Sequence, residues 1–442
     1  MNKRILQLAV PSILANITIP LVGLVDTAIV GHISDASAIG GIAIGTMLFD
    51  LLYWNFGFLR VGTSGMTAQA LGRGDKRECA RLLTQSLGIV GVATVGIWLL
   101  QWLFVTLALA CVPCSPEVAS FARQYFFIRI WAAPATLSLF ALKGWFIGMQ
   151  NTISPMAIDI VVNVVNMVVS YALAVYTPLG AMGVAYGTLV AQYTGLLLGI
   201  ILLAWHYRDI LRGTPVGAIL RDFPSMRRLL VLNGNLFIRS LCFMVVYVGF
   251  TSLASRYGDT ELAVSAILMK LFMLFSYFVD GFAYAGEALV GKAYGEMQNA
   301  EDLQPHKAEL KKIVRLLFEW SVGVGVVFTV IYAIWGGECI ALMTSDSDVI
   351  AHLMPYIGWL IAMPVVSTLA FMWDGVYVGA TAGVEIRNSM VWAAVGFVGC
   401  YLASYYWAGV HALYIAYFAH LVARVVYLTI KWNKVVESPQ PV

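Results

Sequence analysis

The chain has 442 residues, of which 60% are hydrophobic and 12% are charged, and its mean hydropathy is +0.81. A soluble protein of this length needs more polar surface, so the composition predicts a membrane protein. The formal net charge of +3 includes no basic block, which argues against a nucleic-acid partner.

Twelve stretches are long and apolar enough to cross a bilayer as helices, which takes about 20 residues each. They cover residues 5–31, 38–62, 83–110, 120–148, 154–177, 181–206, 229–254, 261–290, 313–343, 349–380, 389–408 and 411–431. We therefore predict an all-α polytopic membrane protein with twelve transmembrane helices.

The loops between these stretches alternate in charge. The N-terminus, the even-numbered loops such as "GRGDKRECAR" and the C-terminus carry most Lys and Arg residues, whereas odd-numbered loops such as "ISDAS" and "TSDSD" are acidic or neutral. By the positive-inside rule, both termini are predicted to be cytoplasmic. We expect a multi-pass protein of the plasma (inner) membrane.

Three short matches indicate an internal repeat. "GHISDASAIGGIAI" at 31–44 aligns with 255–268, "AQALGRGD" at 68–75 with 291–298, and "LKGWFIG" at 142–148 with 373–379. Six helices separate the copies, so both halves have the same orientation across the membrane, as in a parallel repeat. The predicted organisation is an N-terminal lobe 1–206, a cytoplasmic linker 207–228, a C-terminal lobe 229–431 and a cytoplasmic tail 432–442.

Polar residues inside the predicted helices of the first half are candidates for ion coupling, because lipid offers them no hydrogen bonds. Asn163, Asn166 and Ser170 are spaced i, i+3, i+7 and share one helix face. This face should point into the bundle, where Asp26 is a natural partner, and Thr188 lies on the next helix. Asp26 could load and release a proton, or bind Na⁺ among amide and hydroxyl oxygens, or belong to a static packing network.

The second half carries charges of both signs within its predicted helices. Arg239, Lys270, Asp280 and Asp374 are candidates for a substrate cavity, together with Lys143 of the first half. Lys143 and Asp374 occupy equivalent positions of the repeat with opposite charge, so a salt bridge between them is one hypothesis. Asp374 is the preferred second-half residue for substrate contact.

Pro11 and Pro20 flank Asn16 in the first helix. Proline removes a backbone donor and kinks a helix, so these two residues are predicted hinge positions.

The chain lacks the sequence motifs of ATP-driven transporters, of intramembrane metalloproteases and of serine hydrolases. It contains no G-x-x-x-x-G-K-[ST], no H-E-x-x-H and no G-x-S-x-G. Cys111 and Cys114 form a C-x-x-C without a nearby histidine or second pair, so metal binding is not expected, and a disulfide and an unpaired role both stay open. We predict no enzyme activity, no cofactor and no bound metal, apart from H⁺ or Na⁺ as coupling ion.

Six stretches together resemble the multidrug and toxic compound extrusion (MATE) transporters, and within them the DinF branch. They are "LAVPSI", "PLVGLVDTAIVGH", "TAQALGRGD", "DGFAYAGEALVGKAYG", "WDGVYVGAT" and "RNSM". The resemblance implies two six-helix bundles around a central cavity. It also implies export of organic, often cationic or lipophilic, compounds against H⁺ or Na⁺.

The resemblance also assigns expected roles to residues. Asp26 would be the cation-responsive carboxylate of the N-terminal lobe, and Pro11 would mark the bend of the first helix. Asn166 and Thr188 match neighbouring polar positions. Asp374 matches a carboxylate of the C-terminal lobe in some members.

The chain departs from the family pattern at Ser170, where many members have an aspartate four residues after the asparagine. A serine supplies no second negative charge, which makes proton coupling through Asp26 the simpler hypothesis. Asp159 could substitute only if it faced inward.

We therefore expect a monomeric, proton-coupled antiporter of small organic compounds that works by alternating access. Na⁺ coupling and a lipid-linked oligosaccharide flippase of related architecture are the near alternatives, and a major-facilitator transporter is a weaker one. A membrane enzyme or receptor would need a catalytic constellation or a large soluble domain, and the sequence has neither.

Overall fold

The computed structural model describes residues 1–33, 36–112, 114–344 and 347–437, and these residues form helices and short connections without a strand. Twelve segments of this part of the chain are long and apolar enough to cross a membrane, which confirms the predicted helix count. They are Asn2–Gly31, Ser37–Gly72, Lys76–Cys111, Pro116–Gly148, Ile153–Tyr176, Met182–Leu211, Phe223–Tyr257, Asp259–Gln298, Leu303–Ala341, Asp348–Gly379, Gly383–Ala408 and His411–Glu437.

Several helices extend beyond the apolar stretch that predicted them. Helix α11 (Asp259–Gln298) has 40 residues, because its polar C-terminal turns continue the helix past the predicted end at residue 290. Helix α16 (His411–Glu437) likewise continues past residue 431. The predicted linker 207–228 is partly helical, since it contains α9 (Val216–Arg221) and the ends of its two neighbours.

The chain forms two compact units. The N-terminal unit comprises Leu14–Thr67 and Asp75–Leu229, and the C-terminal unit comprises Met1–Ile13, Ala68–Gly74 and Leu230–Val442. Helices α1 (Asn2–Ile33) and α3 (Phe58–Gly72) contribute residues to both units. In α1 the division falls between Pro11 and Pro20, and the helix continues through both prolines.

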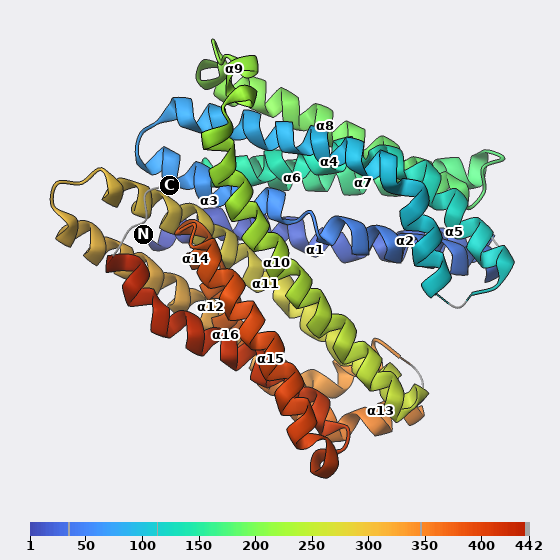
Figure 1. The fold of residues 1–442 in the computed structure, drawn as a ribbon. Helices are drawn as coiled ribbons and strands as arrows, with labels where there is room; N and C mark the ends of the chain where they lie inside the picture. Colours follow the sequence, from blue (N-terminus) through green and yellow to red (C-terminus); the bar gives the residue numbers. More distant parts are fainter. Residues whose placement is uncertain (34–35, 113, 345–346, 438–442) are drawn as a thin grey trace. The chain divides into compact units, whose positions relative to one another are not determined.

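The same pattern of helix packing occurs in each unit (Figure 1). The N-terminal unit includes α2 (Ala36–Trp54), α4 (Lys76–Cys111), α5 (Pro116–Arg129), α6 (Ala133–Gly148), α7 (Ile153–Tyr176) and α8 (Met182–Leu211). Among these helices, α7 packs on α8, α4 on α6 and α2 on α5. The C-terminal unit includes α10 (Phe223–Ala254), α11, α12 (Leu303–Ala341), α13 (Ser347–Leu353), α14 (Ile357–Gly379), α15 (Gly383–Ala408) and α16. Among these helices, α15 packs on α16, α12 on α14 and α11 on α14. Corresponding pairs lie six spans apart, as the sequence repeat requires.

Glycines at equivalent repeat positions make equivalent close contacts. A Cβ on Gly144 would lie 2.2 Å from the carbonyl oxygen of Arg60, and one on Gly375 would lie 2.4 Å from that of Ala283. These distances are too short for any side chain, so the fourth and tenth spans approach the second and eighth with backbone against backbone.

Two repeat-equivalent segments also contact each other within the C-terminal unit. A Cβ on Gly72 would lie 2.1 Å from the carbonyl oxygen of Lys292, and one on Gly295 would lie 2.1 Å from that of Gln69. Because Gln69 corresponds to Lys292 and Gly72 to Gly295 in the repeat, the contact has local two-fold symmetry. Arg73 adds a hydrogen bond from Nη1 to Oε1 of Gln298, at 2.7 Å.

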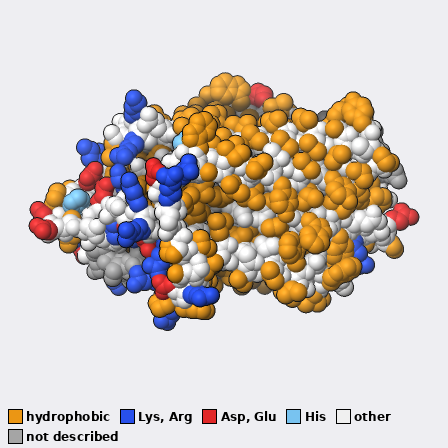
Figure 2. Space-filling view, turned by 90° about the horizontal axis from the view of Figure 1, so that it is seen from above, with side chains coloured by type: hydrophobic (Ala, Val, Ile, Leu, Met, Phe, Trp, Pro, Cys, Tyr) orange, Lys and Arg blue, Asp and Glu red, His pale blue; other side chains and the backbone are white. Residues whose placement is uncertain are grey.

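The surface of the protein is largely apolar. On α4, for example, Leu99 is 77% exposed and Trp102 is 63% exposed. On the face drawn in Figure 2, hydrophobic side chains cover a broad band, and Lys and Arg side chains gather towards one end. Such a surface suits the hydrocarbon of a bilayer, and the chain is a multi-pass membrane protein.

The symmetric glycine contact predicts two sensitive positions. Gly72→Ala or Gly295→Ala should each destabilise the protein by about 1–3 kcal/mol, because the added methyl group meets a backbone carbonyl. Thermal unfolding in detergent measures the effect. The matched control is Gly323→Ala in α12, where an added Cβ meets nothing within 4 Å. Equal unfolding temperatures for all three variants would contradict this packing.

Candidate functional site

The polar face predicted on the fifth span does point into the N-terminal unit. Asn166 and Ser170 are buried on α7, at 3% and 0% exposure, and Asn163 is half-buried. Val164 and Val168, on the other side of the helix, are 48% and 61% exposed. The spacing of the polar residues therefore predicted the orientation of this helix correctly.

The amides of α7 bind hydroxyl groups on two other helices. Asn163 Nδ2 donates to Thr18 Oγ1 on α1 at 2.5 Å, and Asn166 Nδ2 donates to Thr188 Oγ1 on α8 at 2.9 Å. The Asn166 Oδ1 atom is buried and has no hydrogen-bond partner among the described residues. This face thus joins α1, α7 and α8 and still presents an unused acceptor.

Ser170 lies at the closest approach of α7 and α8. A Cβ on Gly187 would lie 2.2 Å from Ser170 Oγ and 2.7 Å from its Cα. The glycine therefore allows the two backbones to pack around this serine. Ser170 Oγ is a second buried oxygen without a hydrogen-bond partner in the described part of the chain.

Asp26 does not form the expected hydrogen bond with the amides of α7. It is half-buried on α1, and its Oδ1 atom is buried without a partner among the residues that the structure describes. Arg129, whose charge acts on both Asp26 and Asp50, donates from Nη1 to Tyr125 Oη at 3.0 Å and lies 4.8 Å from the Phe49 ring centroid. Asp26 is thus a carboxylate of a membrane-spanning helix with an unused buried oxygen.

The hypothesis of a salt bridge between Lys143 and Asp374 is wrong. Lys143 Nζ lies 2.8 Å from Asp159 Oδ1 on the neighbouring helix α7. Asp159 is therefore engaged in an ion pair and does not replace the aspartate missing at Ser170. Asp374 has its own partners, both arginines of the C-terminal unit.

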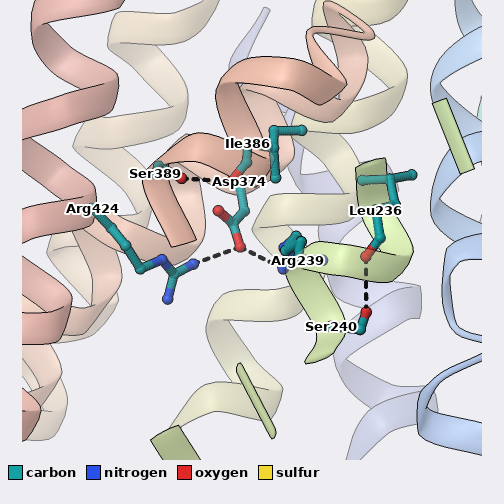
Figure 3. Close-up of polar contacts among 7 residues, drawn as sticks. All are labelled: Leu236, Arg239, Ser240, Asp374, Ile386, Ser389 and Arg424. Carbon is teal, nitrogen blue, oxygen red and sulfur yellow. Dashed lines mark hydrogen bonds and ion pairs between the residues drawn. The ribbon is translucent and has the colours of Figure 1, made fainter. Parts of the chain in front are cut away.

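Asp374 joins three helices of the C-terminal unit (Figure 3). Its Oδ2 atom accepts from Arg239 Nη2 on α10 at 2.5 Å and from Arg424 Nη2 on α16 at 2.6 Å. Arg424 is 1% exposed and Asp374 is 6% exposed. We call Arg239, Asp374, Arg424 and the neighbouring His420 the Asp374 cluster.

The sequence reasoning missed Arg424 and His420. Both are buried on α16, one helical turn apart, in the stretch "AYFAHLVARVV". The i, i+4 spacing of two polar residues in an apolar helix was the available signal, and it resembles the spacing that identified Asn166 and Ser170.

Two further candidates of the second half lie on α11. Lys270 is exposed and Asp280 is half-buried on α11. Cys111 and Cys114 are thiols, so the alternative of a disulfide between them is not realised. No group of three or more His, Cys, Asp or Glu side chains that could hold a metal occurs among the described residues.

Twelve apolar helices, a repeated packing pattern and buried charges on several spans define a polytopic protein of the transporter class. The chain belongs to the MatE family, whose model matches residues 11–172 and again 236–407. The two matches reproduce the repeat seen in the sequence and in the helix packing. Members of this family are transporters rather than enzymes.

The relatives agree with this assignment. The chain is 36% identical over 436 residues to DNA damage-inducible protein F of Escherichia coli (strain K12), covering 98% of this chain and 92% of that protein. It is 24% identical over 418 residues to human Multidrug and toxin extrusion protein 1, covering 90% and 67% of the two chains. A solved structure of an outward-facing multidrug resistance MATE family transporter matches the fold with a TM-score of 0.87 at 17% identity, covering 100% of this chain and 97% of that one.

The geometry of the Asp374 cluster predicts a large cost of neutralising the carboxylate. Asp374→Asn should destabilise the protein by about 3–5 kcal/mol, because it leaves the buried guanidinium of Arg424 and the half-buried guanidinium of Arg239 without their anion. Thermal unfolding in detergent checks this. Glu319→Gln is the matched control, since Glu319 pairs with Arg315 at 2.7 Å on the surface and should contribute about 1 kcal/mol or less. A similar decrease of stability in the two variants would contradict the difference in burial between the two ion pairs.

Proposed function

We propose that the protein exports small organic compounds in exchange for H⁺, with Asp26 as the group that holds the proton. The proposal places the chain in the plasma (inner) membrane as a monomer with both termini in the cytoplasm. Alternating access would expose Asp26 first to the outer side, where it takes a proton, and then to the cytoplasm, where it releases the proton.

The observation that carries the proposal is that Asp26 has an unused carboxylate oxygen and forms no ion pair among the described residues. A buried polar atom without a partner is costly, and a carboxylate in a membrane span is a functional candidate by default. Asp159 pairs with a lysine, and Asp374 pairs with two arginines through Oδ2, although its Oδ1 atom is also buried without a hydrogen-bond partner. Asp26 has an unused buried oxygen and forms no such ion pair among the described residues. Asp26 is therefore the carboxylate best suited to exchange a coupling ion.

Na⁺ is the second candidate for the coupling ion. The buried oxygens Asn166 Oδ1 and Ser170 Oγ have no hydrogen-bond partner in the described structure, and oxygen atoms are the ligands that hard cations prefer. The serine at position 170 favours H⁺, since Na⁺ would have one carboxylate fewer than in many family members.

The family and the relatives support the proposed substrate class. The human relative is a multidrug and toxin extrusion protein, and that name supports organic compounds as substrates of this chain. A flippase for lipid-linked oligosaccharides has less support, because Asp374 offsets one of the two arginine charges beside it and leaves one excess positive charge, fewer than a cavity for pyrophosphate needs.

The proposal predicts that Asp26→Asn abolishes transport driven by a pH gradient. Purified protein in liposomes, loaded with a lipophilic cationic dye such as ethidium, is tested under separate H⁺ and Na⁺ gradients. The wild type should move dye under the H⁺ gradient, and Asp26→Asn should lose at least about tenfold in rate, because the amide cannot carry the proton.

Asp50→Asn is the matched control, since it removes another carboxylate of the same unit that Arg129 also influences. It should keep most of the transport rate. Undiminished H⁺-driven transport by Asp26→Asn would overturn the role of Asp26. Transport that responds only to the Na⁺ gradient would identify Na⁺, and not H⁺, as the coupling ion.

A further inference from the structure

We propose that the Asp374 cluster of the C-terminal unit is a binding site for an oxyanion, such as a carboxylate or phosphate group. The anion would bind the unused donors of Arg424 and His420, next to the ion pair with Asp374. This inference does not rest on proton exchange at Asp26, because it concerns other residues in the other unit.

The charges of the cluster give the first argument. Two guanidinium groups, on Arg239 and Arg424, bind the same oxygen of one carboxylate. The three side chains therefore carry one excess positive charge. Removing a charge from water costs several kcal/mol unless an opposite charge compensates it, and an oxyanion supplies that charge.

The unused donors give the second argument. Arg424 uses Nη2 for Asp374, whereas its Nε and Nη1 atoms are buried and have no hydrogen-bond partner among the described residues. In Figure 3 the guanidinium of Arg424 turns one terminal nitrogen towards Asp374 and the other away from it. A planar guanidinium with unused N–H groups matches the oxygens of a carboxylate or phosphate.

His420 adds a third donor from the same helix face. It lies one turn before Arg424, is 0% exposed, and has the backbone of Ala393 on α15 as a neighbouring polar group. A neutral imidazole carries one N–H, which in one tautomer faces the Ala393 backbone and in the other is available to an oxyanion. Arg239 is more open than Arg424, with 24% of its side chain exposed, and its Nε atom is also unused.

The ligand proposed for the Asp374 cluster is therefore an oxyanion. Either a small organic acid or an anionic lipid head group can supply it. A small acid would extend the transported class to compounds that carry a negative group. A lipid would make the cluster a head-group site.

The test uses the full-length protein in phosphatidylcholine nanodiscs, with 4-bromobenzoate as the probe. The apparent affinity is obtained from the increase of the unfolding temperature with probe concentration. The neutral isostere 4-bromobenzamide and equal concentrations of chloride serve as ligand controls. A second arm replaces phosphatidylcholine with phosphatidylglycerol and repeats the unfolding measurement without probe.

Bromobenzoate should stabilise the wild type, and bromobenzamide and chloride should not. Arg424→Lys keeps the charge but removes the planar donor group, so it should weaken the apparent affinity on the order of tenfold. His420→Leu, which leaves the ion pair intact, should weaken it several-fold. Arg387→Lys is the matched control, because this arginine binds Asn235 and Asn388 instead, and it should retain the wild-type affinity.

Stabilisation by bromobenzoate that depends on Arg424 and His420 supports a small acid. Stabilisation by phosphatidylglycerol with the same dependence supports a lipid head group. No stabilisation by either, equal stabilisation by chloride, or an effect that both variants retain would overturn the proposal. If Arg424→Lys fails to fold, the wild type and His420→Leu still decide the outcome. Asp26→Asn should bind the probe normally, which separates a failure of this inference from a failure of proton coupling.

Discussion

The absence of water from the bilayer core is the constraint on which the rest of this structure depends. Each polar group inside a span must find its partner within the protein or remain costly. Asp374 satisfies the constraint with two arginines, and Asp159 satisfies it with a lysine. Asp26 has an unpartnered buried oxygen and forms no ion pair among the described residues, whereas Asp374, whose Oδ1 is likewise unpartnered, is compensated by two arginines. The missing cation separates Asp26 from the paired carboxylates as a group suited to ion exchange.

The internal repeat organises both units, and their chemistry has diverged within it. Gly144 and Gly375 make the same contact with the backbone of an adjacent span. The next residue towards the N-terminus is Lys143 in one copy and Asp374 in the other, and each pairs with an opposite charge from its own unit. The fold thus conserves the packing between its copies, while the sign of the charge at an equivalent position is reversed.

The sequence was sufficient for the helix count, the repeat and the inward face of α7, because hydropathy and residue spacing report directly on burial in lipid. It was insufficient for the partners of charged residues, because pairing depends on how neighbouring helices rotate. Lys143 and Asp374 have complementary charges but pair with other residues, and Arg424 was overlooked in a predominantly apolar helix. The close contact of Ser170 with Gly187 also required the backbone geometry.

The central claim is that Asp26 exchanges a proton with solvent when substrate binds. Proton release on substrate addition, measured with a pH indicator in weakly buffered detergent, tests this claim without a gradient or a vesicle. The account predicts release from the wild type and from Asp50→Asn, and none from Asp26→Asn that still binds substrate. Equal release from the wild type and Asp26→Asn would contradict it.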